Sequence, residues 1–164
     1  MGTSFNEISD LAYSTLFINY KLDNLLKADE KVFYKFLSGM VLNSASMFNG
    51  ALDNLAFHEE KIFNKDTFEE DTVYVFDREL SGKEKYILAL GVSISLYKRE
   101  LDDVVVYRGK VTTKEFRDIS NSSMLKARQE RLGAMQEEFD QEITALQLNS
   151  IGTNGMDFFS NGGV

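Results

Sequence analysis

The hydrophobic residues of this chain recur mainly at intervals of three or four positions, and this spacing predicts a helical protein. The first helix is expected to begin at Ser4. Ser4 and Glu7 have the spacing of a capping box, in which each side chain satisfies a backbone N–H of the other residue. The apolar stripe that follows consists of Phe5, Ile8, Leu11, Ala12, Thr15 and Leu16.

The second predicted helix has the longest regular pattern in the sequence. Asp29 is a suitable N-cap, and helical spacing then continues for about 24 residues, as far as Leu55. A helix with such a wide apolar face is expected to pack against at least two others. Its stripe consists of Val32, Phe33, Phe36, Leu37, Met40, Val41, Ser44, Ala45, Phe48, Leu52 and Leu55.

The third predicted helix opens with a second capping box, formed by Ser81 and Glu84, and extends to Leu101. Apolar residues surround much of its circumference, which indicates a central helix with neighbours on several sides. Gly91 lies inside it, where glycine costs about 1 kcal/mol relative to alanine. We therefore expect close contact with another backbone at Gly91.

Helical spacing is lost between the second and third helices. Residues 66–71 are interpreted as an acidic loop, and residues 73–76 alternate as in a short β-strand. Because a strand needs a partner, we expect it to pair with the β-branched residues 104–107 or with a neighbouring subunit. Residues 104–113 are then placed between the third and fourth helices.

The fourth predicted helix begins at Asn121 or Ser122 and carries a narrow apolar seam. One apolar residue per seven positions is a weaker pattern than the two of a coiled coil. Acidic residues gather late in this helix, where they oppose its dipole, so we expect some of them to have tertiary or intersubunit partners. The seam residues are Leu125, Leu132, Phe139 and Leu146.

Residues 151–164 contain four glycines and three apolar anchors, Met156, Phe158 and Phe159. Glycine-rich composition predicts a flexible tail, and phenylalanines exposed on such a tail favour aggregation unless a partner receives them. The sequence thus predicts a helical domain over residues 1–150 and a docking tail over residues 151–164. The expected fold class is mainly α: a bundle of about four helices with a short β or extended element and a flexible C-terminal tail.

Composition fits one soluble domain. The chain has 164 residues, of which 43% are hydrophobic, and a domain of this size can fold without a metal or a disulfide. It has no cysteine, which excludes thiolate sites and cysteine nucleophiles. No apolar run approaches the roughly 20 residues of a membrane span, and the first residues lack the pattern of a signal peptide. The net charge of −8 opposes general attraction to nucleic acid or to an anionic membrane.

No motif in the sequence indicates catalysis or metal binding. His58 is the one histidine, and Ile62 stands where a zinc-protease motif would need a second, so a solvated loop residue is the simpler interpretation. Residues 66–71 lack the order of a calcium loop, and neither a nucleophile elbow nor a phosphate loop is present. Lys126, Arg128 and Arg131 could contact phosphates, but adjacent acids dilute their charge. We expect no cofactor and no enzymatic activity.

Taken in order, several segments resemble the head-to-tail connector proteins of tailed bacteriophages, also described as neck or head-completion adaptors. The most specific is the run LSGKEKYILALG at residues 80–91. The resemblance covers about residues 4–148, and after Gly91 this chain has SLYKR where the family pattern has a tryptophan and a proline. Its other segments are Phe5, Ile8, Asp10, residues 20–22, residues 36–39, Ala45, Phe48, residues 112–116, Ser120 and a charged helix over residues 124–148.

This resemblance implies a virion protein made in the host cytoplasm, a subunit of a ring that is typically twelvefold. The ring would join the portal at the capsid vertex to the next neck or tail protein and help to retain packaged DNA. Met156, Phe158 and Phe159 are then candidates for docking on a neighbouring component. Carboxylates facing the channel would let DNA slide past an acidic ring, and the candidates are Asp66, Glu69, Glu70 and Asp71.

A different class of function remains open from the residues themselves. The seam of the fourth helix, Leu125, Leu132, Phe139 and Leu146, could pair two chains into a small dimeric regulatory or binding module. The mass of the particle in solution would distinguish a stable dimer from a subunit that forms large rings with a portal.

Overall fold

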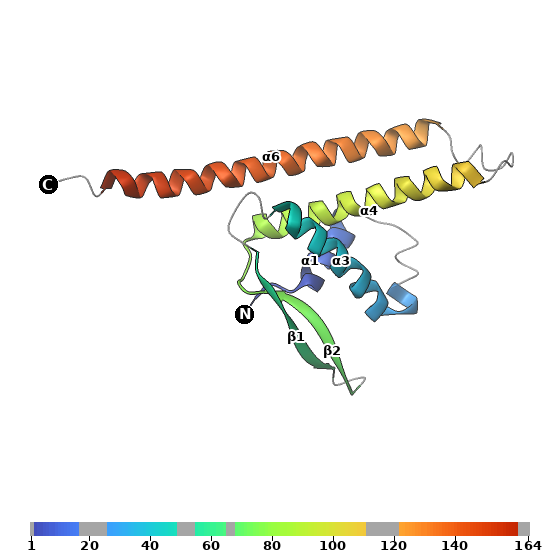
Figure 1. Ribbon diagram of the computed structural model, residues 1–164, viewed down its shortest axis with the longest axis horizontal. Helices are drawn as coiled ribbons and strands as arrows, with labels where there is room; N and C mark the ends of the chain where they lie inside the picture. The colour runs from blue at the N-terminus through green and yellow to red at the C-terminus, as the bar shows by residue number, and fades with distance from the viewer. Residues whose placement is uncertain (1, 17–25, 49–54, 65–67, 111–121, 161–164) are drawn as a thin grey trace.

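The protein is described here from a computed structural model, which covers residues 2–16, 26–48, 55–64, 68–110 and 122–160. It is mainly helical, with one small sheet, as the sequence predicted. Figure 1 shows a compact group of helices from which a β-hairpin and one end of a long helix project. The elements are α1 (Phe5–Leu11), the π-helical turn η1 (Ala12–Leu16), α3 (Glu30–Phe48), β1 (Phe57–Asn64), β2 (Glu69–Phe76), α4 (Gly82–Lys110) and α6 (Ser122–Ser160).

Three of the predicted helix starts are confirmed by their capping hydrogen bonds. The Glu7 N–H donates to Ser4 Oγ at 3.2 Å, and the Val32 N–H donates to Asp29 Oδ1 at 3.1 Å. At α4 both bonds of the capping box are present: the Ser81 N–H donates to Glu84 Oε2 at 2.8 Å, and the Glu84 N–H donates to Ser81 Oγ at 3.3 Å. Each cap satisfies backbone donors that the first helical turn leaves without a partner.

Helix α4 is central, as its apolar circumference predicted. It packs against α1, α3 and α6, and its residues from Ile87 to Leu96 are buried. Two expectations about its surroundings are wrong. Residues 104–107 continue α4 to Lys110, so they are neither a linker nor the partner of a strand. The second predicted helix is shorter than expected: α3 ends at Phe48, and Leu55 precedes β1.

The predicted close contact at Gly91 is present, but it involves side chains rather than a backbone. A methyl group added at Gly91 would lie 2.1 Å from Ser44 Oγ on α3 and 3.1 Å from Phe139 Cε2 on α6. Ser44 Oγ also donates a hydrogen bond to the Leu88 carbonyl at 2.9 Å. Gly91 therefore allows α3 and α6 to approach α4 at the same level.

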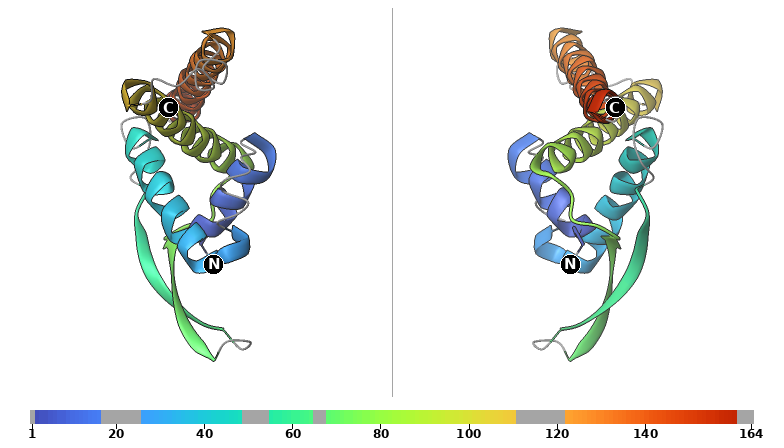
Figure 2. Two further views of the ribbon diagram at one scale, coloured as in Figure 1. Left: turned by 90° about the vertical axis from the view of Figure 1, so that its right-hand side faces the viewer. Right: turned by 90° about the vertical axis from the view of Figure 1, so that its left-hand side faces the viewer.

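The sheet is an antiparallel hairpin of β1 and β2, in register from Phe57 opposite Phe76 to Asn64 opposite Glu69. The predicted strand at residues 73–76 is confirmed, but its partner is β1, which the sequence pattern did not reveal. A third segment pairs with the base of the hairpin, where the Phe76 N–H donates to the Thr3 carbonyl at 2.9 Å. The rest of the hairpin extends away from the helices, as both views of Figure 2 show.

Helix α6 begins at Ser122, as predicted, and lies alongside α4 (Figure 1). The described helix continues through residues 151–160, beyond the point where the glycine-rich composition predicts a tail. Its C-terminal end extends past the other elements. Residues 161–164 lie outside the described part of the chain.

Candidate assembly surfaces

The base of the hairpin is held by aromatic packing around Phe5. The Phe5 ring centroid lies 5.4 Å from that of Phe57, 5.5 Å from that of Tyr74 and 4.7 Å from that of Phe76. Phe57 and Phe76 are opposite each other in the register, and strand residues two apart share a face, so one face of the hairpin base covers α1. This packing fixes the direction in which the hairpin leaves the helices.

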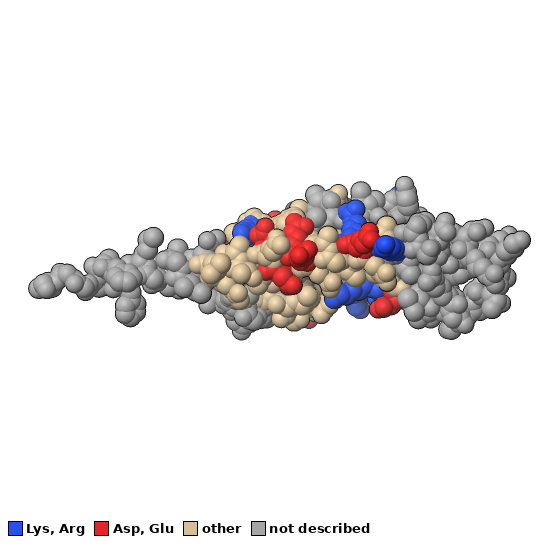
Figure 3. All heavy atoms as spheres, turned by 90° about the horizontal axis from the view of Figure 1, so that it is seen from above, with Lys and Arg blue, Asp and Glu red and all other residues tan. Residues whose placement is uncertain are grey.

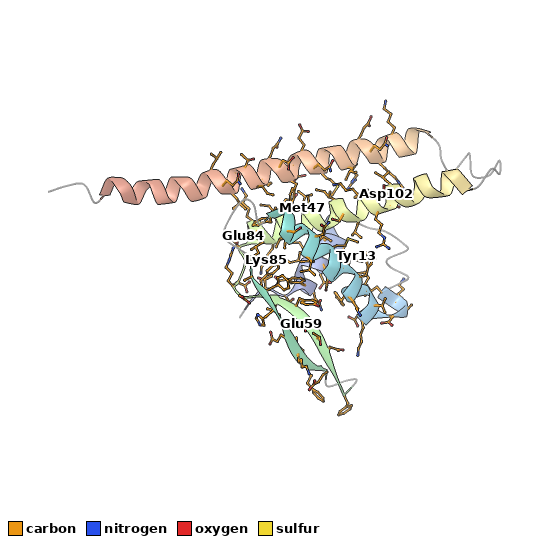
Figure 4. All side chains as sticks on the ribbon, viewed as in Figure 1. Tyr13, Met47, Glu59, Glu84, Lys85 and Asp102 are labelled. Carbon is orange, nitrogen blue, oxygen red and sulfur yellow. The ribbon has the colours of Figure 1, made fainter. Side chains whose placement is uncertain are left out.

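Ionic contacts at the start of α4 fix the same junction. Arg78 Nη2 and Nη1 donate to the two oxygens of Glu84 at 2.5 and 3.2 Å, a bidentate pairing. Lys85, beside Glu84 in Figure 4, donates to Glu7 Oε1 at 2.8 Å and to Glu79 Oε1 at 2.6 Å. Arg78 and Glu79 in the segment between β2 and α4, together with the first turn of α1, are thus tied to the start of α4. The hydrogen bonds from Arg78 lower the pKa of Glu84 to about 2.

Further out, the hairpin is held by exposed polar pairs. Lys61 Nζ lies 3.1 Å from Glu70 Oε2 across the strands, and Lys31 Nζ of α3 lies 2.8 Å from Asp71 Oδ1. Tyr74 hydrogen-bonds to Glu59, which raises the pKa of Tyr74. Exposed pairs of this kind each contribute less than about 1 kcal/mol. They orient the outer hairpin without giving it a core.

The end of the hairpin carries three exposed apolar side chains, which we call the hairpin tip: Ile62, Phe63 and Phe68. Their exposed fractions are 48%, 56% and 80%. The rings of Phe63 and Phe68 lie 6.5 Å apart, edge to face. Ile62 and Phe63 are neighbours in β1 and therefore point to opposite faces, so the tip is apolar on both sides.

Phe68 has a φ of 54°, in the left-handed region that favours glycine or asparagine. A bulky side chain in this conformation stores strain of about 1–3 kcal/mol. The turn would be more stable with a small residue, so the aromatic ring at this position points to a role outside the fold. The tip was not predicted from the sequence; the signal for it is the pair Phe63 and Phe68 on either side of a short polar segment.

Helix α6 is fastened to α4 by a buried ring and two polar contacts. The Phe139 ring packs against Gly91 of α4. Tyr86 Oη donates a hydrogen bond to Glu138 Oε1 at 2.6 Å, and Lys83 Nζ forms an ion pair with Glu142 Oε2 at 2.9 Å. These contacts confirm that acids late in this helix have tertiary partners. The hydrogen bond to Glu138 raises the pKa of Tyr86 to about 12.

The predicted seam therefore lies largely inside the fold. Phe139 is 3% exposed and belongs to the hydrophobic core, and Leu132 and Leu146 are partly buried against it. Phe139 is therefore not available to bind a partner, because α4 of the same chain covers it, while partner binding by Leu132 and Leu146 stays a prediction. The side chain of Leu125 lies outside the described part of the structure.

The acidic candidates lie on the hairpin and not in a loop. Glu69, Glu70 and Asp71 are the first residues of β2, while Asp66 falls outside the described residues. Glu70 and Asp71 are each paired with a lysine of the same chain, which partly neutralises their negative charge.

The apolar anchors of the predicted tail lie on the part of α6 beyond the core. Met156, Phe158 and Phe159 belong to the helix, and their side chains are outside the described part. Leu146 is the last residue of α6 with a described side chain that packs against the core, and residues 147–160 continue the helix for about 21 Å at 1.5 Å per residue. We call these residues the α6 overhang.

The basic residues early in α6 are engaged by neighbours. Arg128 Nη1 lies 3.2 Å from Glu100 Oε1, Arg131 lies over the ring of Tyr97 at 5.7 Å, and Lys126 lies 3.9 Å from Glu130. Figure 3 shows acidic and basic side chains interspersed along the outer face of α6. This mixture does not form a basic patch on the face shown.

The described residues include no group of three or more His, Asp or Glu side chains that could hold a metal ion. His58 lies in β1, not in a loop as expected, and its Nδ1 is 2.6 Å from Asp77 Oδ1. Within the same described ranges, no helix is both long and apolar enough to cross a membrane.

Comparison of the chain with protein-family models, with curated proteins and with solved structures gave no match.

Proposed function

We propose that this chain is a structural virion protein, a subunit of a ring adaptor that joins the portal at the capsid vertex to the next neck or tail component. The observation that carries this proposal is the pair of projecting elements. The hairpin tip and the α6 overhang leave one folded core in different directions (Figure 1). A subunit that must contact several neighbours at once needs separate contact elements of this kind.

The fold supports this role because its core is independent of both projections. The buried cluster is formed by α1, α3, α4, the middle of α6 and the base of the hairpin. Among the apolar side chains that the structure describes in the projections, Phe63, Phe68 and Leu148 do not belong to it. Contacts made by the projections can therefore form or dissociate without unfolding the subunit, as the assembly of a neck requires.

In this proposal the α6 overhang docks on the portal, with Met156, Phe158 and Phe159 as its anchors. Copies of the chain form a ring, which resemblance to the connector family makes twelvefold. The net charge of −8 disfavours adhesion of the ring to packaged DNA, which could then slide through while the assembled neck helps to retain it. The carboxylates of Glu69, Glu70 and Asp71, with Asp66, are the candidates for the channel side.

Truncation of the overhang tests the proposal. The full chain and a chain lacking residues 151–164 would each be mixed with the portal protein encoded in the same genome, and binding would be followed by native mass spectrometry and negative-stain microscopy. We expect the truncated chain to keep the helical circular dichroism spectrum of a folded domain and to lose portal binding. Equal portal binding by both chains would refute docking through the overhang, and no binding by the full chain would refute the adaptor function.

Point variants separate the anchors from the helix that carries them. The triple variant Met156→Ser, Phe158→Ser and Phe159→Ser is expected to lose portal binding in the full-length chain. A matched polar variant, Thr153→Ser with Asn154→Ser, is the control and is expected to bind normally. The dimeric regulatory module remains the alternative: a stable two-chain particle that ignores the portal would support it, although Phe139 of its seam is buried within the chain.

A further inference from the structure

We propose that the hairpin tip of one copy docks on the exposed face of α3 of the next copy, and that this head-to-tail contact closes the ring. The inference rests on the proposed ring function and names the contact that builds it. It is carried by the apolar tip, by an apolar row on α3, and by opposite charge around the two surfaces.

The hairpin tip requires an apolar partner. Ile62, Phe63 and Phe68 form a protruding apolar end, and Phe68 keeps its ring in a strained backbone conformation. A two-stranded hairpin projecting into water is marginally stable by itself, and insertion of the tip between side chains of another surface would stabilise it. The charge of the hairpin selects the partner further, because residues 57–76 contain six acidic residues against two lysines.

Helix α3 presents a surface with the matching properties. Val32, Phe36, Met40 and Met47 lie at spacings of four and seven on one side of the helix and form what we call the α3 row. Val32 and Met47 are exposed, and Phe36 and Met40 are partly so. Beside the row, Gly39 is exposed and a methyl group added there would meet no atom within 4 Å, so this position is open to solvent.

Basic side chains border the α3 row. Lys35 is exposed on α3, and the Arg99 guanidinium of α4 lies over the Phe36 ring at 4.9 Å from its centroid, next to the exposed Lys98. An aromatic tip with carboxylates around it and an apolar row bordered by cations are complementary in apolar character and in sign of charge.

The two surfaces are placed for a contact between copies. Lys31 at the start of α3 pairs with Asp71 of the same chain, which lies opposite Ile62 in the outer part of the hairpin, and the turn end then leads away from the helices (Figures 1 and 2). Tip and row are different surfaces, so their contact is heterologous, and repetition of a heterologous contact produces either a closed ring or an open filament. In a closed ring every subunit uses both surfaces, so a contact that is weak in one pair is reinforced around the ring.

Charge reversal at the two surfaces tests the contact in the full-length chain, without a portal. Glu70→Lys on the hairpin and Lys35→Glu on α3 each place like charges together, and each is expected to weaken self-association about tenfold in sedimentation velocity. An equimolar mixture of the two variants is expected to restore association. In the mixture every contact between unlike variants joins either the native pair or the reversed pair, so an alternating arrangement has no like-charge contact. Glu137→Lys and Lys126→Glu on α6 are matched controls that should leave association unchanged.

Cross-linking captures the same contact even when few chains are associated at any time. Because the chain has no cysteine, only the introduced thiols can form the disulfide. Asn64→Cys, at the end of β1 beside the tip, and Gly39→Cys chains, mixed under mild oxidation, are expected to form a cross-linked pair, whereas Glu137→Cys with Gly39→Cys is not. Association and cross-linking in this pattern would support the contact. A wild-type chain that stays monomeric at millimolar concentration, a mixture that fails to rescue, or absence of the specific cross-link would overturn it. Portal binding is measured separately, so the adaptor function can survive that result.

Discussion

Glu84 is a charged residue that is 8% exposed, and it closes both a capping box and a bidentate ion pair. Burial of a carboxylate is unfavourable unless hydrogen bonds replace water. Here Arg78 and the Ser81 N–H supply them, and they outweigh burial, so the pKa falls from 4.5 to about 2. The charged form of Glu84 is therefore part of the folded state.

Replacement of Glu84 by glutamine should destabilise the protein in a pH-dependent manner. The folded-state pKa lies below the unfolded value, so the charge contributes fully above about pH 4.5, and its contribution is lost as the pH falls towards 2. At neutral pH the loss should be at most about 3 kcal/mol, reduced by solvent screening at the half-exposed Arg78. Urea denaturation of both chains at pH 7 and pH 3 measures it. An equal loss at the two pH values would contradict the assignment.

Gly91 is the residue at which α3, α4 and α6 meet. Gly91→Ala would bring a methyl group to within 2.1 Å of Ser44 Oγ, and overpacking of this kind costs about 1–3 kcal/mol. Gly133→Ala on α6 is the control, since a methyl group there meets nothing within 4 Å and removal of a helical glycine should stabilise by up to about 1 kcal/mol. The two substitutions are expected to change the free energy of unfolding in opposite directions. Changes of the same sign would show that Gly91 is not closely packed against Ser44 and Phe139.

At the scale of elements, the question is whether α6 packs against α4 of its own chain or pairs with α6 of a second chain. Phe139→Ala removes a buried ring and should lower the free energy of unfolding by about 3 kcal/mol or more. Because α4 of the same chain provides the contact, any dependence of the unfolding temperature on protein concentration should be the same with and without this substitution. Leu148→Ala, at an exposed position of α6, should change little. A concentration-dependent transition that Phe139→Ala abolishes would instead favour pairing of two chains through this helix.

The helices were largely predictable because their caps and apolar stripes are local features. Ser4, Asp29 and the pair Ser81 and Glu84 mark helix starts wherever the chain is placed. The prediction that residues 104–107 could pair as a strand was wrong. Their valine-rich sequence favours strands, but they follow a buried helix and continue it. Propensity is a weak effect compared with the packing that α4 already makes on three sides.

The hairpin was only half predictable for a physical reason. β2 contains the alternating segment 73–76, whereas the central residues of β1, from His58 to Lys61, are polar and charged and are exposed on both faces. Without a buried face a strand leaves no period of two in the sequence. The same lack of burial makes the tip a candidate contact surface. Solvent exposure of the outer hairpin therefore explains both why β1 was not predicted and why we propose a contact there.

At the scale of the whole molecule, the chain divides its apolar residues between one core and two exposed sites. The core joins α1, α3, α4 and α6, and it leaves the hairpin tip and the α3 row in contact with water. Exposed apolar surface is unfavourable for an isolated protein and useful for one that assembles. Stability of the subunit and strength of assembly should therefore respond differently to changes at the tip.

Phe68→Asn separates the two properties. Asparagine accepts a positive φ more readily than phenylalanine, so the free energy of unfolding should stay constant or rise by up to about 1 kcal/mol, although the exposed ring contact with Phe63 is lost. Self-association should fall about tenfold, because the most exposed apolar group of the tip is removed. Phe68→Tyr keeps a ring in the same conformation and should retain both properties. Thermal unfolding and sedimentation velocity on the three chains measure the two effects. A loss of stability in step with association would mean that Phe68 serves the fold of the hairpin rather than the joining of subunits.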